Sequence, residues 1–316
     1  MANQTALVAG YDRKNPIRTL RHMRKQWQLY LFVLLPVAFV IIFAYVPMYG
    51  VVLAFKDYNV RLGILGSPWA GTKYFQQFFS SPMFSTTIRN TLLLSLYSLI
   101  VGFPIPIILA LFLNEVRFAK FKKTVQLVTY APYFISTVVM VGMLLNFLHT
   151  RHGFINIIIQ SMGFEAINFM ANPNYFRTIF IASGIWQTMG YSAIIYIAAL
   201  SNADPTLYEA AIIDGANRYQ KIKHIDIPTI LPTATLLLIL SMGSLMSVGV
   251  DKVLLMQNPL NLQTSEVIST YVYKVGLLSG QFSFATAVGV FNSVVNFILI
   301  VVINTVASKV GETSLW

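Results

Sequence analysis

The sequence predicts an all-α membrane protein with six transmembrane helices, and two observations lead to this fold class. The 316 residues are 56% hydrophobic and only 10% charged, whereas soluble domains usually carry about 25% charged residues. Six stretches without Asp, Glu, Lys or Arg are each long enough to cross the roughly 30 Å hydrocarbon core as a helix. Lipid cannot satisfy an open backbone, and the alternating pattern of a membrane barrel is absent, so helices are the expected structure.

The six predicted spans follow one another along the whole chain. They cover residues 29–49, 90–113, 124–148, 178–201, 229–250 and 283–307. The predicted organisation is therefore a basic tail over residues 1–28 and a six-span transmembrane domain over residues 29–316.

The first predicted span follows a basic region and could be mistaken for a cleavable secretory signal. About 20 apolar residues is too long for the core of a signal, and no small-x-small cleavage site follows. We therefore expect a retained helix. The preceding segment NPIRTLRHMRKQWQLY, residues 15–30, predicts a basic amphipathic helix that lies on the inner membrane face.

The distribution of Lys and Arg predicts the orientation of the chain. With the N-terminus inside, 14 of the 22 basic residues fall on the cytoplasmic side, as the positive-inside rule requires. Both termini are then expected in the cytoplasm. The net charge of +11 follows from this bias and from anionic lipid head groups, so nucleic acid is not an expected partner.

The loop over residues 202–227 reads as a structured element between the fourth and fifth spans. Asp204 and Pro205 are a helix N-cap and first-turn pair, and the helix formers TLYEAAII follow. Gly215 permits a sharp turn, and ANRYQKIKHIDI predicts a second short helix that runs into Pro228. Two short helices with small residues at their junction predict a surface that docks into another protein.

The stretch EAAIIDGANRYQKIKHIDIP, residues 209–228, resembles the EAA loop of the membrane-spanning subunits of binding-protein-dependent ABC importers. In that family the loop is the coupling helix that docks into a cleft of the ATPase. One departure is Ile222, which stands where the family commonly has Phe. The resemblance implies a coupling role for Glu209, Ala210, Ala211, Asp214, Gly215, Ala216, Ile222 and Pro228.

This resemblance also implies a fold, a set of partners and a location. The fold would be that of a six-helix type I ABC importer permease in the bacterial inner membrane. Its partners would be a second homologous permease, two ATPases, an external solute-binding protein and a glycan. No GxxxxGK[ST] phosphate loop occurs in the chain, so the subunit is not expected to be an enzyme, and ATP and Mg²⁺ are expected on the ATPase chains.

A second resemblance narrows the expected cargo. Residues 252–276, KVLLMQNPLNLQTSEVISTYVYKVG, and residues 72–92, TKYFQQFFSSPMFSTTIRNTL, resemble the polysaccharide-type permeases of the maltose-importer class, which include importers of alginate. An oligosaccharide or polysaccharide is therefore the expected substrate class, with alginate oligosaccharides as the specific expectation.

A sugar path needs hydrogen-bonding groups and aromatic faces that pack on the sugar ring. Polar groups inside a membrane are costly when they face lipid, so those of spans four to six are expected to point inward. The candidates for the path are Trp186, Gln187, Tyr191, Tyr196, Ser244, Asn292 and Asn296. An alternative role for the same residues is hydrogen bonding between helices.

Two other functions compete with this interpretation. A channel or a secondary carrier is the first, but carriers usually place Asp, Glu, Lys or His inside the membrane for ion coupling, and the six spans contain none of these. An intramembrane serine protease is suggested by GYSA, residues 190–193, yet all four histidines lie outside the spans and cannot act as its base. His149 and His152 have metal-like spacing, but no third ligand is close in the sequence, so no metal site is expected.

Overall fold

The computed structural model describes residues 26–310, and within them the chain is almost entirely helical. An isolated antiparallel bridge joins Lys56 and Trp69. The chain divides into two compact units, Met1–Val52 and Leu53–Trp316, so the division falls after the first predicted span and not before it. Residues 1–25, most of the predicted basic tail, lie outside the described residues.

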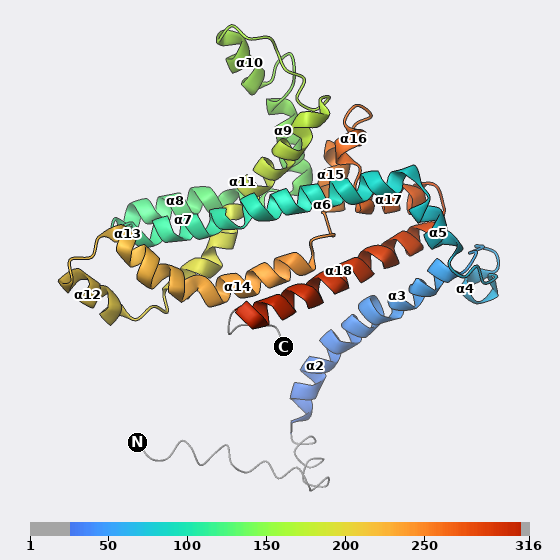
Figure 1. Cartoon of the computed structure of the whole chain (residues 1–316), viewed down its shortest axis with the longest axis horizontal. Coiled ribbons are helices and arrows are strands. Elements are labelled where there is room, and N and C mark those ends of the chain that lie inside the picture. The colour runs from blue at the N-terminus through green and yellow to red at the C-terminus, as the bar shows by residue number, and fades with distance from the viewer. Residues whose placement is uncertain (1–25, 311–316) are drawn as a thin grey trace. The chain divides into compact units, whose positions relative to one another are not determined.

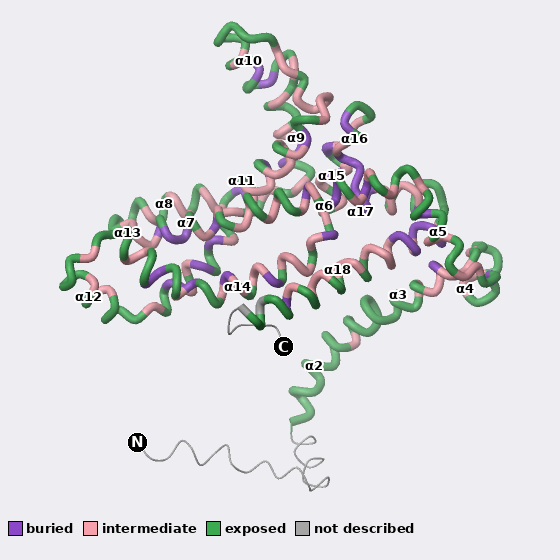
Figure 2. Tube along the Cα trace, viewed as in Figure 1, coloured by how far each residue is buried: buried purple, intermediate pink, exposed green. Residues whose placement is uncertain are grey.

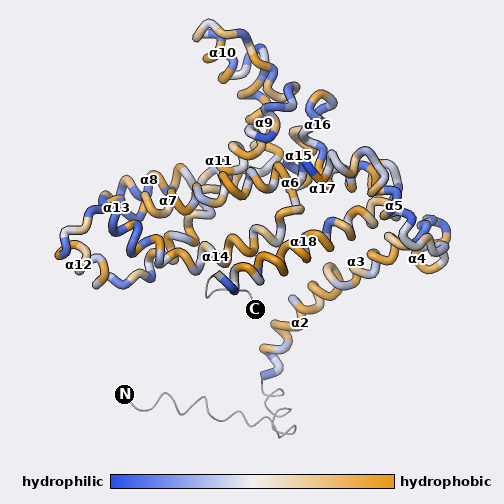
Figure 3. The backbone as a smooth tube through the Cα atoms, viewed as in Figure 1, coloured by the Kyte–Doolittle hydropathy of each residue, from blue (hydrophilic) through white to orange (hydrophobic). Residues whose placement is uncertain are grey.

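The first unit contains one long apolar helix whose described part begins at Trp27. Its segments are α2 (Trp27–Val40), the π-helical turn η2 (Ile41–Tyr45), α3 (Val46–Met48) and the start of η3 (Tyr49–Phe55). The wide π turn ends two residues before Pro47, which has no backbone N–H to donate to a preceding carbonyl. Most residues of α2 and α3 are exposed and apolar (Figures 2 and 3), as a lipid-facing helix requires.

The second unit holds three further helices that are long and apolar enough to cross a membrane. They are α6 (Pro82–Gly102) with α7 (Pro104–Glu115), α13 (Arg218–Lys221) with η5 (Ile222–Asp226) and α14 (Ile227–Gly243), and α18 (Phe282–Val310). The helices α14 and α18 run side by side, and α6 continues into α7 (Figure 1). These helices correspond to the second, fifth and sixth predicted spans.

The fifth predicted span was wrong at its end, because the helix stops at Gly243 instead of continuing to residue 250. Tight turns follow, in which Ser244 N–H bonds Ser241 O at 3.3 Å and Ser247 N–H bonds Ser244 O at 2.9 Å. The side chain of Asn296 on α18 accepts from Met246 N–H at 3.0 Å. The helix therefore ends at Gly243, although residues 244–250 contain no charged residue that would have predicted its end.

The third predicted span, 124–148, is not one continuous helix. It is a pair consisting of α8 (Ala119–Tyr130) with the 3₁₀ turn η4 (Ala131–Phe134), followed by α9 (Thr137–Phe147), and the two parts are bent by 102°. Pro132 lies in the turn, and Ser136 starts the next helix by accepting a hydrogen bond from Val139 N–H. Counted as one broken span, the pair raises the number of membrane-spanning candidates among the described residues from four to five.

The fourth predicted span lies in α11 (Pro173–Leu200), the central helix of the second unit. It packs against α6, α7, α8, α14 and α16 (Leu262–Ser265). Its 28 residues are long enough to cross a bilayer, but its polar side chains keep it out of the group of strongly apolar helices. The expected six spans are thus four apolar helices, one bent pair and one helix that contains several polar residues.

Shorter helices complete the second unit. They are α4 (Gly63–Gly66), α5 (Lys73–Phe79), α10 (Phe154–Ser161), α12 (Pro205–Ile213), α15 (Val250–Met256), α17 (Ile268–Tyr273) and η6 (Lys274–Leu278). In Figure 1, α12 lies at the opposite end of the second unit from α4 and α5.

Candidate functional site

The segment 202–228, here called the elbow, begins with the first of the two predicted helices. Asp204 caps α12, and its side chain accepts a hydrogen bond from Thr206 N–H at 2.9 Å. The N–H and hydroxyl of Thr206 hold the pKa of Asp204 below its usual range. Pro205 occupies the first turn, where its missing N–H costs nothing. The predicted start of this helix is therefore confirmed.

Gly215 ends α12 in the way its position predicts. Its φ of +73° is left-handed, and the N–H groups that follow the helix fold back onto its last carbonyls. Ala216 N–H bonds Ala211 O at 2.8 Å, and Gly215 N–H bonds Ile212 O at 3.1 Å, which is a Schellman motif. A side chain at Gly215 would meet no atom within 4 Å, so backbone conformation alone requires glycine here.

The second helix of the elbow was predicted as a short separate helix, and that prediction was wrong. Asn217 and Gln220 form a capping box that starts α13, and the helix then runs without a break from Arg218 to Gly243. The π-helical turn η5 ends two residues before Pro228. Its wider hydrogen-bonding pattern accommodates the missing N–H of the proline, so the helix continues.

The outer face of the elbow carries both the motif residues and a group of exposed apolar side chains. Glu209, Ala210, Asp214, Gly215 and Pro228 are exposed, while Ala211 and Ala216 are half-buried. Ile213 is 86% exposed and Tyr219 is 71% exposed, and Leu207 and Ile212 are exposed beside them. Motif matching missed these four apolar residues, although the run TLYEAAII contains more apolar positions than one buried helix face needs.

Ile222 has a different environment from the exposed motif residues. It is half-buried and packs against the cluster that contains Leu111, Tyr196 and Ile230. Arg218 Nε on the same helix lies 3.9 Å from Glu115 Oε2 at the end of α7. Ile222 therefore anchors the elbow to its own subunit in this structure.

A buried polar cluster attaches α12 to the rest of the second unit. The hydroxyl of Tyr208 on α12 donates to Asp226 Oδ1, and Asn114 Nδ2 at the end of α7 lies 3.4 Å from the same oxygen. Asp226 is 0% exposed. Burial, followed by the hydrogen bond to Asp226, raises the pKa of Tyr208 to about 12, so the phenol remains a donor at physiological pH. Sequence reasoning missed this cluster, because its three members lie on three separate segments.

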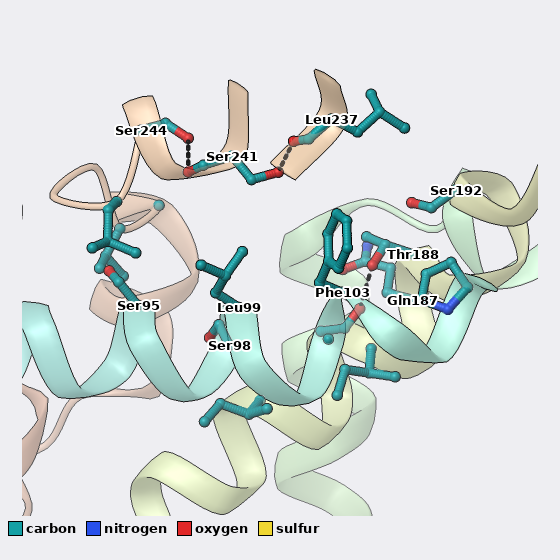
Figure 4. A pocket seen from close by; sticks show the side chains of 18 of the residues that line it. Ser95, Ser98, Leu99, Phe103, Gln187, Thr188, Ser192, Leu237, Ser241 and Ser244 are labelled. Carbon is teal, nitrogen blue, oxygen red and sulfur yellow. Dashed lines mark hydrogen bonds between the residues drawn. The ribbon is translucent and has the colours of Figure 1, made fainter. Parts of the chain in front are cut away.

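A cavity of about 560 Å³ lies between α6, α7, α11, α14 and α15. Its wall combines apolar side chains with polar ones, which are Ser95, Ser98, Gln187, Thr188, Ser192, Tyr196, Ser241, Ser244, Ser247 and Lys252. Figure 4 shows Ser241 and Ser244 on the opposite wall from Ser95 and Leu99. Several hydroxyls donate to their own helix, such as Ser241 Oγ to Leu237 O at 2.7 Å, and so keep their acceptor lone pairs free.

Of the seven residues predicted for a substrate path, three line this cavity: Gln187, Tyr196 and Ser244. Trp186, Tyr191, Asn292 and Asn296 lie outside its wall. Tyr191 stacks on Tyr133 with ring centroids 3.8 Å apart. Asn296 bonds the turn that follows α14, as described above, and so performs the alternative role of hydrogen bonding between segments.

Lys252 lines the cavity although it lies outside the six predicted spans, between the fifth and the sixth. Because the chain turns after Gly243, α15 brings this side chain back against α11. Its Nζ donates to Phe180 O at 2.7 Å and lies 4.4 Å from the centroid of the Phe180 ring. No cluster of three or more His, Cys, Asp or Glu residues within residues 26–310 could hold a metal ion. His149 and His152 stack on each other with ring centroids 3.6 Å apart.

Comparison with known proteins agrees with this architecture. Residues 102–311 match the family described as "Binding-protein-dependent transport system inner membrane component". The chain is 44% identical over 299 residues to the polygalacturonan/rhamnogalacturonan transport system permease protein YteP of Bacillus subtilis (strain 168), covering 95% of this chain and 93% of that protein. It is 30% identical over 234 residues to the arabinooligosaccharides transport system permease protein AraP of the same strain, covering 73% of each chain.

A solved structure is similar over nearly the whole length. It is a chain of a bacterial ABC transporter involved in the import of the acidic polysaccharide alginate, with a TM-score of 0.86, 38% sequence identity, and coverage of 93% of this chain and 99% of that one. The type I importer fold expected from the elbow motif is therefore confirmed. The chain belongs to the family of binding-protein-dependent transport system inner membrane components, as a permease subunit of the sugar and polysaccharide ABC transporters.

Proposed function

We propose that this chain is one of two membrane-spanning subunits of an ATP-driven importer that carries uronate-containing oligosaccharides or polysaccharides across the bacterial inner membrane. The observation that carries this proposal is similarity over more than nine-tenths of the chain to a polygalacturonan/rhamnogalacturonan permease and to an alginate importer chain. Both named cargoes contain sugar acids. Alginate oligosaccharides and pectin-derived oligogalacturonates are the two specific candidates.

The elbow is proposed to be the site at which an ATPase subunit docks. Ile213 and Tyr219 present apolar surface of the kind that anchors an interface, and Glu209 and Asp214 stand beside them. The two termini and the elbow would face the cytoplasm. ATP and Mg²⁺ would bind to the ATPase chains, and a solute-binding protein would deliver the glycan from outside. A related transporter was solved with an alginate pentasaccharide-bound periplasmic protein.

The proposed cycle links the elbow to the polar cavity. Closure of the ATPases on ATP would draw the elbows of the two permeases together and move α14, which is continuous with the second helix of the elbow. One wall of the cavity belongs to α14, so its movement would open the cavity to the outside and admit glycan. The hydroxyls on the wall are suited to hydrogen bonding with sugar hydroxyls.

The experiment is ATP-dependent uptake in proteoliposomes that contain this subunit with its partner permease, the two ATPases and the solute-binding protein. Glu209→Lys reverses a charge on the docking surface, and Gly215→Glu places a charged side chain at its turn. Both variants should assemble and lose ATP-coupled uptake of the uronate oligosaccharide.

Two controls separate docking from folding. Gly163→Glu also puts glutamate at a left-handed glycine, with a φ of +85° and no atom within 4 Å, so it costs about the same 1–2 kcal/mol of backbone strain. Glu165→Lys repeats the charge reversal at an exposed position outside the elbow. Both controls should keep wild-type uptake. Unchanged uptake in the elbow variants, or uptake without ATP, would contradict the proposal and favour a channel or carrier.

A further inference from the structure

We propose that Lys252 is the carboxylate-recognising residue of the polar cavity, and that its ammonium group pairs with the carboxylate of a sugar acid that occupies the cavity. This inference rests on the proposed function. It adds the residue by which the membrane subunit would distinguish an acidic sugar from a neutral one.

The position of Lys252 is the first observation. It lies on the wall of the polar cavity of about 560 Å³, among hydroxyl groups from α6, α11 and the turn after α14. Of the residues on that wall, Lys252 alone carries a positive charge, and none is Asp or Glu. A sugar acid in this space would find hydroxyl partners for its hydroxyls and a single cation for its carboxylate.

The second observation is that Lys252 has no counter-ion within residues 26–310. No carboxylate oxygen of these residues lies within 4.0 Å of its Nζ. Glu266, the buried acid of the neighbouring segment, is bound by Lys274 Nζ at 2.5 Å and by Thr270 Oγ1 at 2.9 Å. Asp251, next in sequence, is exposed. A partly buried cation without a partner is costly, and an anionic ligand would relieve that cost.

The third observation is that the ammonium group is fixed in place but not covered. A lysine has three N–H donors. One donates to Phe180 O, and the face of the Phe180 ring supports the charge from another side. The next turn of α11 carries Gly184, where an added Cβ would lie 3.1 Å from Nζ. Because Gly184 has no side chain, it places none against the ammonium of Lys252, which lines the cavity, and such pre-organisation favours binding.

The test is direct binding to the complete transporter in lipid nanodiscs without its solute-binding protein, so that only the membrane subunits select. The probes are labelled alginate trisaccharide and trigalacturonate, each compared with its fully methyl-esterified, neutral form. Lys252→Gln removes the charge and keeps a polar N–H donor, while Lys252→Arg keeps the charge. Lys56→Gln is the matched control, because Lys56 Nζ also donates to backbone carbonyls, Ile64 O at 2.7 Å and Leu65 O at 3.0 Å, but lines no part of the cavity.

Lys252→Gln should weaken binding of the acidic trisaccharides by at least about tenfold and leave binding of their esters within about twofold. Lys252→Arg and Lys56→Gln should retain preference for the acids. Gly184→Ala gives an independent test that leaves the lysine in place, because its methyl group crowds Nζ and should weaken acid binding more than ester binding.

Two results would overturn the inference. One is wild-type acid binding by Lys252→Gln, and the other is an equal loss of acid and ester, which would indicate a purely structural role. ATP-driven uptake by the wild-type complex separates the two proposals. If the wild type imports the acids and Lys252→Gln binds them normally, only the proposed role of Lys252 is wrong. If the wild type imports neither acids nor esters, the proposed function itself is wrong.

Discussion

The attachment of the elbow to its own subunit can be tested with Tyr208→Phe. This change removes the hydroxyl that donates to Asp226 Oδ1 and leaves that oxygen with Asn114 Nδ2 at 3.4 Å. Oδ2 of Asp226 has no hydrogen-bond partner among the described residues. A hydrogen bond to a buried charged group contributes about 1.5–3 kcal/mol, so the expected loss is about 2 kcal/mol, or about 30-fold in the equilibrium for local opening of α12.

Hydrogen exchange measured by mass spectrometry on the assembled complex provides the assay. Peptides that cover residues 205–213 should exchange about 30-fold faster in Tyr208→Phe. Tyr219→Phe is the control, since it removes a phenol hydroxyl from an exposed position of the same elbow. Adding Asp226→Asn to Tyr208→Phe should recover much of the protection, because the buried group is then neutral. Equal exchange in the Tyr208 and Tyr219 variants would refute the idea that this cluster holds α12.

Two further predictions concern the cavity and the central helix. Burial lowers the pKa of Lys252 on α15 to about 8, so its ammonium loses its proton as pH rises from 7 to 9. The preference for acidic over esterified trisaccharides should therefore fall over this range, and Lys252→Arg should abolish this fall, both followed by the binding assay above. Gly190→Ala should prevent assembly of the complex, because the new Cβ would collide with Thr129 O. Gly289→Ala on α18 should assemble normally, because an added Cβ there would meet no atom within 4 Å. Size-exclusion chromatography would distinguish the two variants.

Local chemistry made the first half of the elbow predictable from sequence. Asp204 and Gly215 act through their own backbone neighbourhoods, so their roles as cap and turn depend little on the rest of the fold. The second half was not predictable in this way. A proline usually marks a helix boundary, but here the helix continues past Pro228 through a π-helical turn that ends two residues before it.

The cavity was only partly predictable for a different reason. Hydropathy identifies which helices contain polar residues but not which neighbour each side chain contacts. Adjacent residues such as Trp186 and Gln187 point about 100° apart around the helix, and only Gln187 of this pair lines the cavity. Lys252 shows the same limit. The sequence places it correctly outside the apolar spans, but its contact with Phe180 depends on a turn after Gly243 that apolarity does not reveal.

The unbroken helix from Arg218 to Gly243 begins in the elbow and ends at the wall of the cavity, so the two sites are joined by one rigid rod. Its 26 residues span about 39 Å at 1.5 Å per residue. If such a rod tilts by about 10° about one end, the other end moves by about 7 Å. A small angular displacement of a docked ATPase would thus be amplified at Ser241 and Ser244, whereas a separate short helix in the elbow would have allowed the joint to absorb it.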